Sequence, residues 1–470
     1  MKKQCFGVIV TTRGFFPSHL VKTAREQITK LMDDMGFDYV MVSEAETKHG
    51  AVLTYEEALT CASLFKKHAD DISGIICILP NFGEETGVAE AIDRAGLNVP
   101  VLVHACDDDL SMLQMENRRD SFCGKISLCN NLYQRGIRYT GTTHHTCKID
   151  SLEFKKDLEY FAAVCRVVKG LHGSRIAMLG ARPNAFNTVR FSEKILQMYG
   201  ISVQSVDFSE VIAAAESISD EALIKEKEAE IRSYGKITFD VTDSKITDQA
   251  RLCIALENFV DDLSCQASTV QCWDSVQKNY GCSTCLAMSM MGEKGKPSAC
   301  ESDVTGAVSM LAAHLASGSA PALVDWNNNY GEDRDKCIVF HCSNYPKSFF
   351  GNREIEISVQ DILGKIVGFE KTFGTIQGQA EAGPVTFIRV TTDDEMGLMK
   401  AYIGEGEFTD DLIDTKGGIA VCRIPDLGKL LEHICDNGFE HHVCFIRGNY
   451  AKVLAEALGK YMGADVYLHS

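Results

Sequence analysis

Short apolar runs alternate with amphipathic segments along the first part of the chain. The apolar runs lie at 5–12, 37–42, 74–80 and 99–105, and segments with helical spacing lie at 18–35, 55–68 and 84–95. Apolar runs of this length separated by helices are typical of a parallel sheet whose crossover connections are helical. The pattern predicts a doubly wound, Rossmann-like α/β domain over residues 1–150.

The same alternation continues in the middle of the chain and then changes. Helical segments at 151–168, 189–199 and 243–262 and strand-like segments at 175–186, 202–208 and 268–273 predict a second doubly wound α/β domain over residues 151–350. After about Gly351 the chain consists of short alternating segments bounded by Gly, Asp and Thr, at 355–359, 365–373, 385–392, 399–408 and 419–424. They predict an antiparallel, β-barrel-like domain over residues 351–470.

The composition excludes several classes of function. The chain has 470 residues and a formal net charge of −18, without a basic stripe, which argues against nucleic-acid binding. It contains no apolar run of about 18 residues and no signal-peptide pattern, so no membrane association is expected. Most of the 19 cysteines lie in apolar runs, which predicts reduced thiols in a cytoplasmic protein. The CxxC formed by Cys282 and Cys285 is interpreted as a helix start.

Two acids flank a short segment in the second half of the chain. Glu301 precedes an apolar helix at 304–315, which Ser302 or Asp303 can cap, so its carboxylate lies near the positive end of the helix dipole. Asp325 follows a short buried strand, at the edge where open α/β sheets bind ligands. The alternative is that these are an ordinary helix-start acid and an ordinary loop acid.

Several other side chains are predicted to lie near the same sheet edges. The two tryptophans of the chain border the acid pair, and aromatic rings near acids often stack on sugar faces. Polar residues that follow predicted strands are further candidates for binding a ligand. The candidates from these two arguments are Arg13, Trp273, Trp326, His341, Ser343 and Asn344.

Five short motifs together resemble the L-fucose/L-arabinose isomerase superfamily. They are ACESDVTGA around Glu301, LVDW at Asp325, QCWDSVQ, FHCSNYP and EHHV. The resemblance implies a divalent-metal-dependent aldose–ketose isomerase that works through a cis-enediol(ate), with Mn²⁺, or Mg²⁺ or Co²⁺, as cofactor. It implies Glu301, Asp325 and His441 as metal ligands, because the family histidine lies two residues before a strand valine. Gln271 and His442, from the same motifs, join the candidate substrate-binding residues.

Two carboxylates and one imidazole suit this reaction. Moving a carbonyl from C1 to C2 of a sugar requires removal of a proton from carbon and stabilisation of an enediolate, whose two oxygens a hard cation can bind. Oxygen-rich ligation favours Mn²⁺ or Mg²⁺ over zinc. Glu301 and Asp325 are therefore expected to act as the acid/base pair as well as ligands, in an order that the sequence does not assign.

The substrate class stays open among L-fucose-like sugars, pentoses such as L-arabinose, and sulfoquinovose, a 6-sulfonated glucose. An anionic sugar needs a cation, and Arg13, Arg182 and Arg447 are the candidates. The alternative functions are a metal-dependent aldolase, a non-catalytic sugar-binding protein, and a non-haem iron oxygenase, whose triad of two histidines and one carboxylate fits poorly. The resemblance also implies a homo-oligomer with its active site near a subunit interface, where Arg13 can act in trans.

Overall fold

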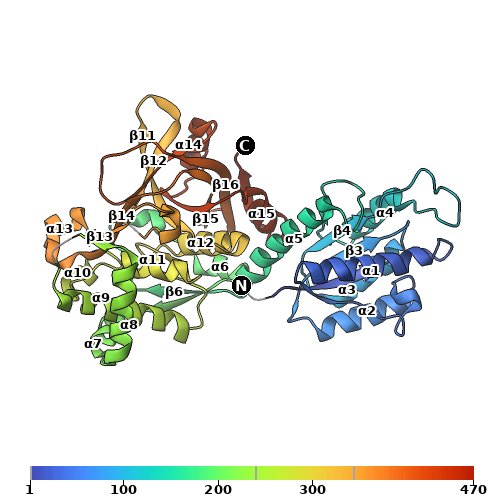
Figure 1. Cartoon of the computed structure of the whole chain (residues 1–470), viewed down its shortest axis with the longest axis horizontal. Helices are drawn as coiled ribbons and strands as arrows, with labels where there is room; N and C mark the ends of the chain where they lie inside the picture. The colour runs from blue at the N-terminus through green and yellow to red at the C-terminus, as the bar shows by residue number, and fades with distance from the viewer. Residues whose placement is uncertain (1–2, 239–240, 342–343) are drawn as a thin grey trace. The chain divides into compact units, whose positions relative to one another are not determined.

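The computed structural model describes residues 3–238, 241–341 and 344–470. It divides into Met1–Lys169, here called unit 1, and Gly170–Ser470, here called unit 2. Many of their elements are labelled in Figure 1. Among the described residues, no helix is both long and apolar enough to cross a lipid bilayer.

Unit 1 contains a five-stranded parallel sheet of order β2-β1-β3-β4-β5. Its elements are β1 (Cys5–Val10), α1 (His19–Asp34), β2 (Asp38–Val40), α2 (Tyr55–Lys67), β3 (Ile72–Leu79), α3 (Glu85–Ala95), β4 (Val101–Ala105), α4 (Ser121–Gln134), β5 (Thr140–Gly141) and α5 (Leu152–Leu171). Because successive strand residues point to opposite faces, Ile9 packs with α2, α3 and α4, while Val8 and Val10 pack with α1 and α5. Helices thus cover both faces of the sheet, and the predicted α/β class is confirmed.

Unit 2 begins with a four-stranded parallel sheet of order β10-β9-β6-β7. Its strands are β6 (Arg175–Leu179), β7 (Ser202–Val206), β9 (Ala267–Val270) and β10 (Ser298–Ala299), and the helices between and after them are α6 (Glu193–Met198), α7 (Phe208–Ser217), α8 (Glu221–Tyr234), α9 (Asp243–Asp262), α10 (Ser275–Asn279), α11 (Cys285–Glu293) and α12 (Val304–Ser317). The side chains of Asp220, Thr242 and Asp303 cap α8, α9 and α12 by accepting backbone N–H groups. Such a cap contributes about 1 kcal/mol.

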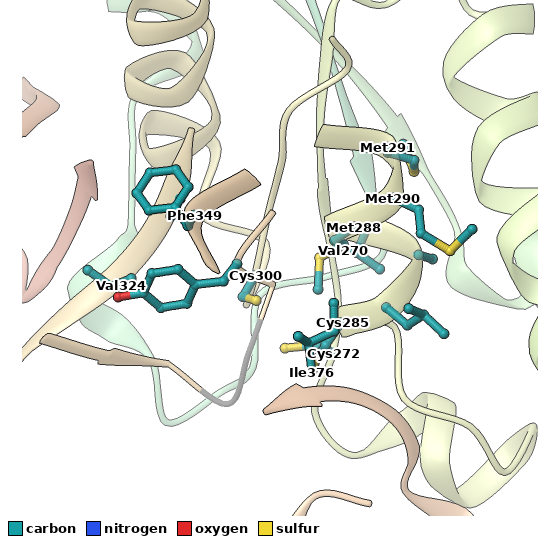
Figure 2. Packing of buried hydrophobic residues seen from close by; sticks show 14 of the residues in the cluster. Val270, Cys272, Cys285, Met288, Met290, Met291, Cys300, Val324, Phe349 and Ile376 are labelled. Atoms are coloured by element: carbon teal, nitrogen blue, oxygen red, sulfur yellow. The ribbon is translucent and has the colours of Figure 1, made fainter. Parts of the chain in front are cut away.

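The core of unit 2 is rich in sulfur-containing side chains. Figure 2 shows the methionines of α11 beside Val270 and Cys272 at the end of β9. Eight of the nine residues of α11 are buried, so this helix is apolar on all sides. Cys285 is its first residue and Cys282 lies just before it. The interpretation of the CxxC as a helix start is confirmed.

The remainder of unit 2 is a ten-stranded mixed sheet of order β19-β16-β15-β18-β11-β12-β17-β14-β13-β8. The strands are β8 (Lys236–Ile237), β11 (Ala322–Tyr330), β12 (Asp333–His341), β13 (Glu356–Val359), β14 (Phe373–Gln379), β15 (Gly383–Asp393), β16 (Leu398–Thr409), β17 (Gly418–Arg423), β18 (His442–Arg447) and β19 (Asp465–Leu468). The helices are α13 (Asp361–Val367), α14 (Leu427–Asp436) and α15 (Ala451–Ala455), which continues as a π-helical turn at Glu456–Tyr461. An additional pairing of β16 with β17 closes six antiparallel strands into a ring, β16-β15-β18-β11-β12-β17.

Two local expectations are wrong. The strand before Asp325 does not end there: β11 continues to Tyr330 and pairs antiparallel with β12 and β18, so Asp325 lies within an antiparallel sheet and not at the end of a parallel one. The segment 365–373 is mostly not a strand, because the Gln360 side chain caps α13 by accepting from the Leu363 N–H, and β14 begins only at Phe373.

Candidate active site

Glu301 is held in a strained turn between β10 and α12. Glu301 and Ser302 both have positive φ, 53° and 56°, in a region that costs a non-glycine residue on the order of 1–3 kcal/mol. Backbone and side-chain hydrogen bonds hold this turn, since Ser302 N donates to Val270 O at 3.2 Å and Ser302 Oγ to Gly180 O at 3.3 Å. The turn therefore fixes Glu301 at the carboxyl ends of β6 and β9.

The two carboxylate oxygens of Glu301 face different partners. Oε1 accepts hydrogen bonds from Trp273 Nε1 at 2.9 Å and from Cys272 Sγ at 3.5 Å. Oε2 lies 3.5 Å from His442 Nε2 and 3.7 Å from His341 Nε2, and it has no hydrogen-bond partner within the described residues. Burial alone would raise the pKa of Glu301, but the neighbouring His341, His442 and Trp273 lower it to about 2. Glu301 is therefore a carboxylate at neutral pH.

Asp325 and the two adjacent histidines meet across neighbouring strands. Asp325 pairs with His442 in the register of β11 and β18. Asp325 Oδ1 lies 3.5 Å from His442 Nε2 and 3.6 Å from His441 Nε2, and like Glu301 Oε2 it is buried without a hydrogen-bond partner in the described part of the chain. His442 is 1% exposed, whereas His441 is 43% exposed. Of the two, His442 is the one that faces both acids.

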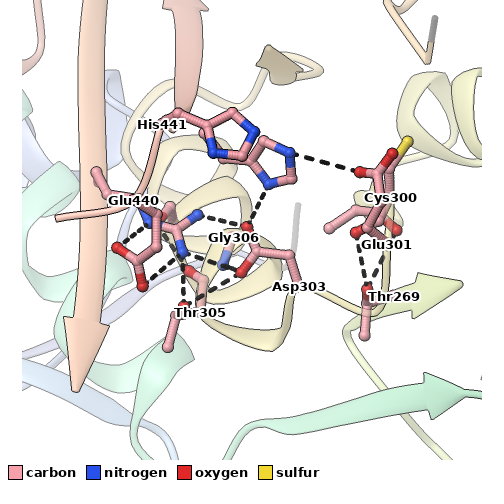
Figure 3. A network of polar contacts seen from close by, with 12 residues as sticks. Thr269, Cys300, Glu301, Asp303, Thr305, Gly306, Glu440 and His441 are labelled. Carbon is pink, nitrogen blue, oxygen red and sulfur yellow. Dashed lines mark hydrogen bonds and ion pairs between the residues drawn. The ribbon is translucent and has the colours of Figure 1, made fainter. Parts of the chain in front are cut away.

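A buried chain of charges orients His442 (Figure 3). Its Nδ1 lies 2.8 Å from Asp303 Oδ2, and Arg389 donates to both oxygens of Asp303, at 2.5 and 3.0 Å. Arg389 also pairs with Glu440 at 3.0 Å. Burial would raise the pKa of Asp303, but Arg389 and His442 hold it far below its usual range. Because an ionised carboxylate only accepts hydrogen bonds, His442 carries a proton on Nδ1, which leaves Nε2 as the ring nitrogen that faces the acids.

The arrangement fits a hard divalent cation. Glu301 Oε2 and Asp325 Oδ1 are buried acceptors without donors among the described residues, and each lies 3.5 Å from His442 Nε2. Neighbouring ligands of an octahedral ion with bonds of about 2.1 Å lie about 3 Å apart, so both acids would have to move toward His442 to bind one ion. The possible ligands form two groups that share His442: Glu301 with His341 and His442, and Asp325 with His441 and His442. Two oxygens and one nitrogen, with open positions, are a donor set for Mn²⁺ or Mg²⁺.

Two segments of the chain, one near each end, match models of known protein families. Residues 7–172 match the model of the "Fucose/sulfoquinovose isomerase, N-terminal domain", and residues 339–469 match that of the "L-fucose isomerase, C-terminal domain". Together these segments cover more than half of the chain. The chain belongs to the L-fucose isomerase superfamily. These matches confirm the resemblance to the superfamily that was inferred from the five short motifs.

Curated relatives of this superfamily member are named sulfoquinovose isomerase. Those of Alkalicoccus urumqiensis and Priestia aryabhattai are both 24% identical to it, over 62% and 65% of this chain and 64% and 67% of their own lengths. The match thus spans less than two thirds of the Alkalicoccus protein. A Clostridium relative (strain MSTE9) is 29% identical over 39% of this chain and 40% of its own. Among solved structures, a periplasmic sugar-binding protein of an ABC transporter from Legionella pneumophila matches with a TM-score of 0.18 and 13% sequence identity. The match covers 68% of this chain and 97% of that protein.

Three other predicted residues lie beside the candidate site, and a fourth lies on the opposite face of β11. Trp273, Gln271 and Asn344 support the site: Gln271 Oε1 accepts from Ala181 N at 3.1 Å, and Asn344 Nδ2 donates to Ser298 O at 2.9 Å, next to the Glu301 turn. Trp326 points to the opposite face of β11 from Asp325, where its Nε1 donates to Tyr402 Oη at 2.9 Å.

The remaining predicted residues are Ser343, Arg13 and Arg447. Ser343 lies outside the described residues. Arg13 belongs to unit 1, where it pairs with Glu84 and Glu85, so its role stays a prediction. Arg447 lies at the far end of β18 from His442 and donates to Phe349 O at 2.6 Å.

The sequence analysis missed three residues of the candidate site, Arg389, Glu440 and Phe186. Arg389 and Glu440 complete the charge chain, and a lone arginine inside the apolar run VTFIRVTT was the available signal for a buried ion pair. Phe186 lies in the turn after β6, with its ring centroid 4.8 Å from that of Trp273 and 5.9 Å from that of His441. No pattern in the sequence singles out Phe186, because its contacts come from segments distant along the chain.

Asp303→Asn is expected to weaken Mn²⁺ binding about 10- to 100-fold, because an amide no longer fixes the tautomer and orientation of His442. The measurement is the dissociation constant from titration of the free Mn²⁺ signal in electron paramagnetic resonance. Asp207→Asn is the matched control, since Asp207 also caps a helix, accepting from Ser209 N at 2.8 Å, but contacts no histidine. A folded Asp303→Asn protein with unchanged affinity would contradict the orienting role.

Proposed function

We propose that the protein is a divalent-metal-dependent aldose–ketose isomerase acting through a cis-enediol(ate). The observation that carries the proposal is the placement of two donor-free carboxylate oxygens, on Glu301 and Asp325, each 3.5 Å from the same imidazole nitrogen of His442. Membership of an isomerase superfamily favours this reaction over a metal-dependent aldolase and over a non-catalytic sugar-binding protein. Mn²⁺ is the proposed cofactor, with Mg²⁺ or Co²⁺ as substitutes.

The acid/base work falls to Glu301 and Asp325. A bound hard cation would supply electrostatic stabilisation for the two neighbouring oxygens of the enediolate. Glu301 is ionised, with a pKa of about 2, and the Trp273 indole holds its Oε1 so that Oε2 faces the centre. Asp325 is 23% exposed and can return the proton at the adjacent carbon. The Phe186 ring packs against Trp273 and lies near His441, and so presents an apolar surface beside the candidate site.

The test of the proposed function is an aldose panel assayed with the purified full chain. We expect ketose formation that is lost with a chelator and restored by Mn²⁺. The panel contains sulfoquinovose, L-fucose and L-arabinose. Absence of ketose from every aldose in the presence of Mn²⁺, or turnover that survives complete metal removal, would overturn the proposal.

His442, and not His441, is proposed as the nitrogen ligand. His442 is buried, its Nδ1 faces Asp303, and its Nε2 faces both acids, whereas His441 faces Asp325 alone. We expect His442→Gln to weaken Mn²⁺ binding at least about 100-fold and His441→Gln less than about tenfold. Both dissociation constants are measured on the same metal-free preparation. The reverse order of effects would restore His441 as the ligand.

Sulfoquinovose is the proposed substrate among the three classes. The support is that the curated relatives carry the name sulfoquinovose isomerase. A sulfonate needs a cation near a site with two acids. Arg182 is the candidate in unit 2, because it lies on the turn that carries Phe186 and, within the described part of the chain, donates to that turn through Nη1 alone. A kcat/KM for L-fucose or L-arabinose equal to or above that for sulfoquinovose would contradict this assignment.

We also propose a domain division, an oligomeric state and a cellular location for the protein. They are the division into domains 1–150, 151–350 and 351–470, a homo-oligomer with Arg13 acting near a subunit interface, and a cytoplasmic location. The last is supported by the burial of most of the described cysteines, which is typical of reduced thiols. Sedimentation of the purified chain measures the oligomeric state.

A further inference from the structure

Glu301 has a second set of metal-binding neighbours on the side away from Asp325. The Sγ atoms of Cys272 and Cys300 and a carboxylate oxygen of Glu301 all lie within 4.8 Å of one another, and all three residues are buried. Cys272 follows β9 and Cys300 follows β10, so two adjacent parallel strands deliver the two thiols (Figure 2). Of the three groups of possible ligands among the described residues, this is the one that contains sulfur.

The spacing of the donors suits a tetrahedral ion. Cys272 Sγ lies 3.5 Å from Glu301 Oε1, and Cys300 Sγ lies 3.7 Å from His341 Nδ1. With bonds of about 2.3 Å to sulfur and 2.0–2.1 Å to nitrogen or oxygen, adjacent ligands of tetrahedral zinc lie about 3.5 Å apart. The Cys272–Glu301 edge already has this length, and Cys300 Sγ lies within 4.8 Å of Cys272 Sγ and of a Glu301 oxygen, so these three donors can bind one ion after adjustment.

We propose that Cys272, Cys300 and Glu301 form a site for a thiophilic divalent cation such as Zn²⁺ or Cd²⁺, back to back with the hard-metal centre. Thiolate ligands select softer ions than the oxygen-rich set on the other side of Glu301. Each thiol gives its proton to solvent as its sulfur binds the ion, so two protons are released for each ion bound.

The two centres share Glu301 through different atoms. Glu301 offers Oε1 to the thiol side and Oε2 to the His442 side. An ion on the thiol side would displace the Trp273 N–H from Oε1 and pull Glu301 from the hard-metal centre. Zn²⁺ and Cd²⁺ are thus inhibitors that act from behind the carboxylate. Only this inhibition rests on the proposed isomerase activity; the binding does not.

The experiment is a Cd²⁺ titration of the metal-free full chain, followed by the sulfur-to-cadmium charge-transfer absorption in the ultraviolet. All proteins carry Cys123→Ser and Cys435→Ser, which remove the two thiols that are exposed among the described residues. We expect a saturable band for one ion, reduced to about half in Cys272→Ser and in Cys300→Ser, with affinity weakened at least about tenfold. Cys285→Ser is the matched control, because Cys285 is equally buried, 3% exposed, but lies outside the cluster.

A band that both cluster variants leave unchanged, or that Cys285→Ser removes equally, would overturn the proposal. A second measurement keeps both cluster cysteines and so does not depend on whether the variants fold. X-ray absorption of zinc bound at one equivalent is expected to show two sulfur neighbours at about 2.3 Å. A zinc shell of nitrogen and oxygen alone would overturn the site. Because neither readout uses turnover, failure of the thiol site and failure of the isomerase assignment are distinguishable.

Discussion

Glu301→Gln is expected to lower kcat/KM for the aldose substrate by about a thousandfold, even with Mn²⁺ in large excess. An amide cannot accept a proton from carbon, and it is a weaker ligand than a carboxylate. The substitution keeps the size of the side chain, and the amide oxygen can still accept from Trp273 Nε1, which lies 2.9 Å from Oε1. The loss is therefore chemical and does not come from a disrupted fold. Steady-state assays at saturating Mn²⁺ measure it.

Glu293→Gln is the control for this substitution. Glu293 ends α11 in the same unit, and its carboxylate accepts from Ser348 N at 2.7 Å, away from the candidate site. We expect turnover of this control to stay within about twofold of the wild-type value. If Glu301→Gln also stays within that range, Glu301 is neither the base nor a required ligand, and the acid/base assignment is wrong.

Arg389→Met is expected to lower the free energy of unfolding by about 3–5 kcal/mol, because it leaves two carboxylates buried without a counter-charge. Arg389 and Asp303 are both 0% exposed and Glu440 is 4% exposed. Burial would lower the pKa of Arg389, but these two acids raise it far above its usual range. Urea unfolding measures the change. The same variant is expected to weaken Mn²⁺ binding, since Asp303 then loses the partner that holds it against His442.

An exposed arginine provides the control for stability. Arg334 pairs with Glu332 at 3.1 Å, with side chains 75% and 95% exposed, and Arg334→Met is expected to change stability by less than about 0.5 kcal/mol. Adding Asp303→Asn and Glu440→Gln to Arg389→Met is expected to recover part of the lost stability, because the unpaired charges are removed. Equal stability of the Arg389 and Arg334 variants would show that the buried chain of charges does not hold the site together.

Local patterns predicted the elements better than their partners. The helix at 243–262 and the alternation of strands and helices in unit 1 were predicted correctly, because these features depend on spacing within about 20 residues. The strand before Asp325 was recognised, but its antiparallel neighbours were not, since one of them, β18, lies more than 100 residues further along the chain. An apolar run does not specify which strand it will pair with.

The candidate site divides in the same way. Glu301, Asp325 and the histidine doublet came from short motifs, and Asp303 was recognised as a possible cap of α12. Its second contact, with His442, joins residues 139 positions apart and has no local signal. The motif selected His441, since the burial of His442 depends on contacts with Asp303 and Arg389 that are distant along the chain.

Which member of the histidine doublet faces the acids is decided by the hydrogen-bonded ladder between β11 and β18, in which Asp325 stands opposite His442. Displacing β18 by a single position would exchange its two faces. An imidazole would still lie beside Asp325, but without the carboxylate behind it. Alignments of relatives that shift EHHV by one position thus keep a histidine in the column but move the proposed ligand by one residue. The ladder, and not the motif, is the reference to align on.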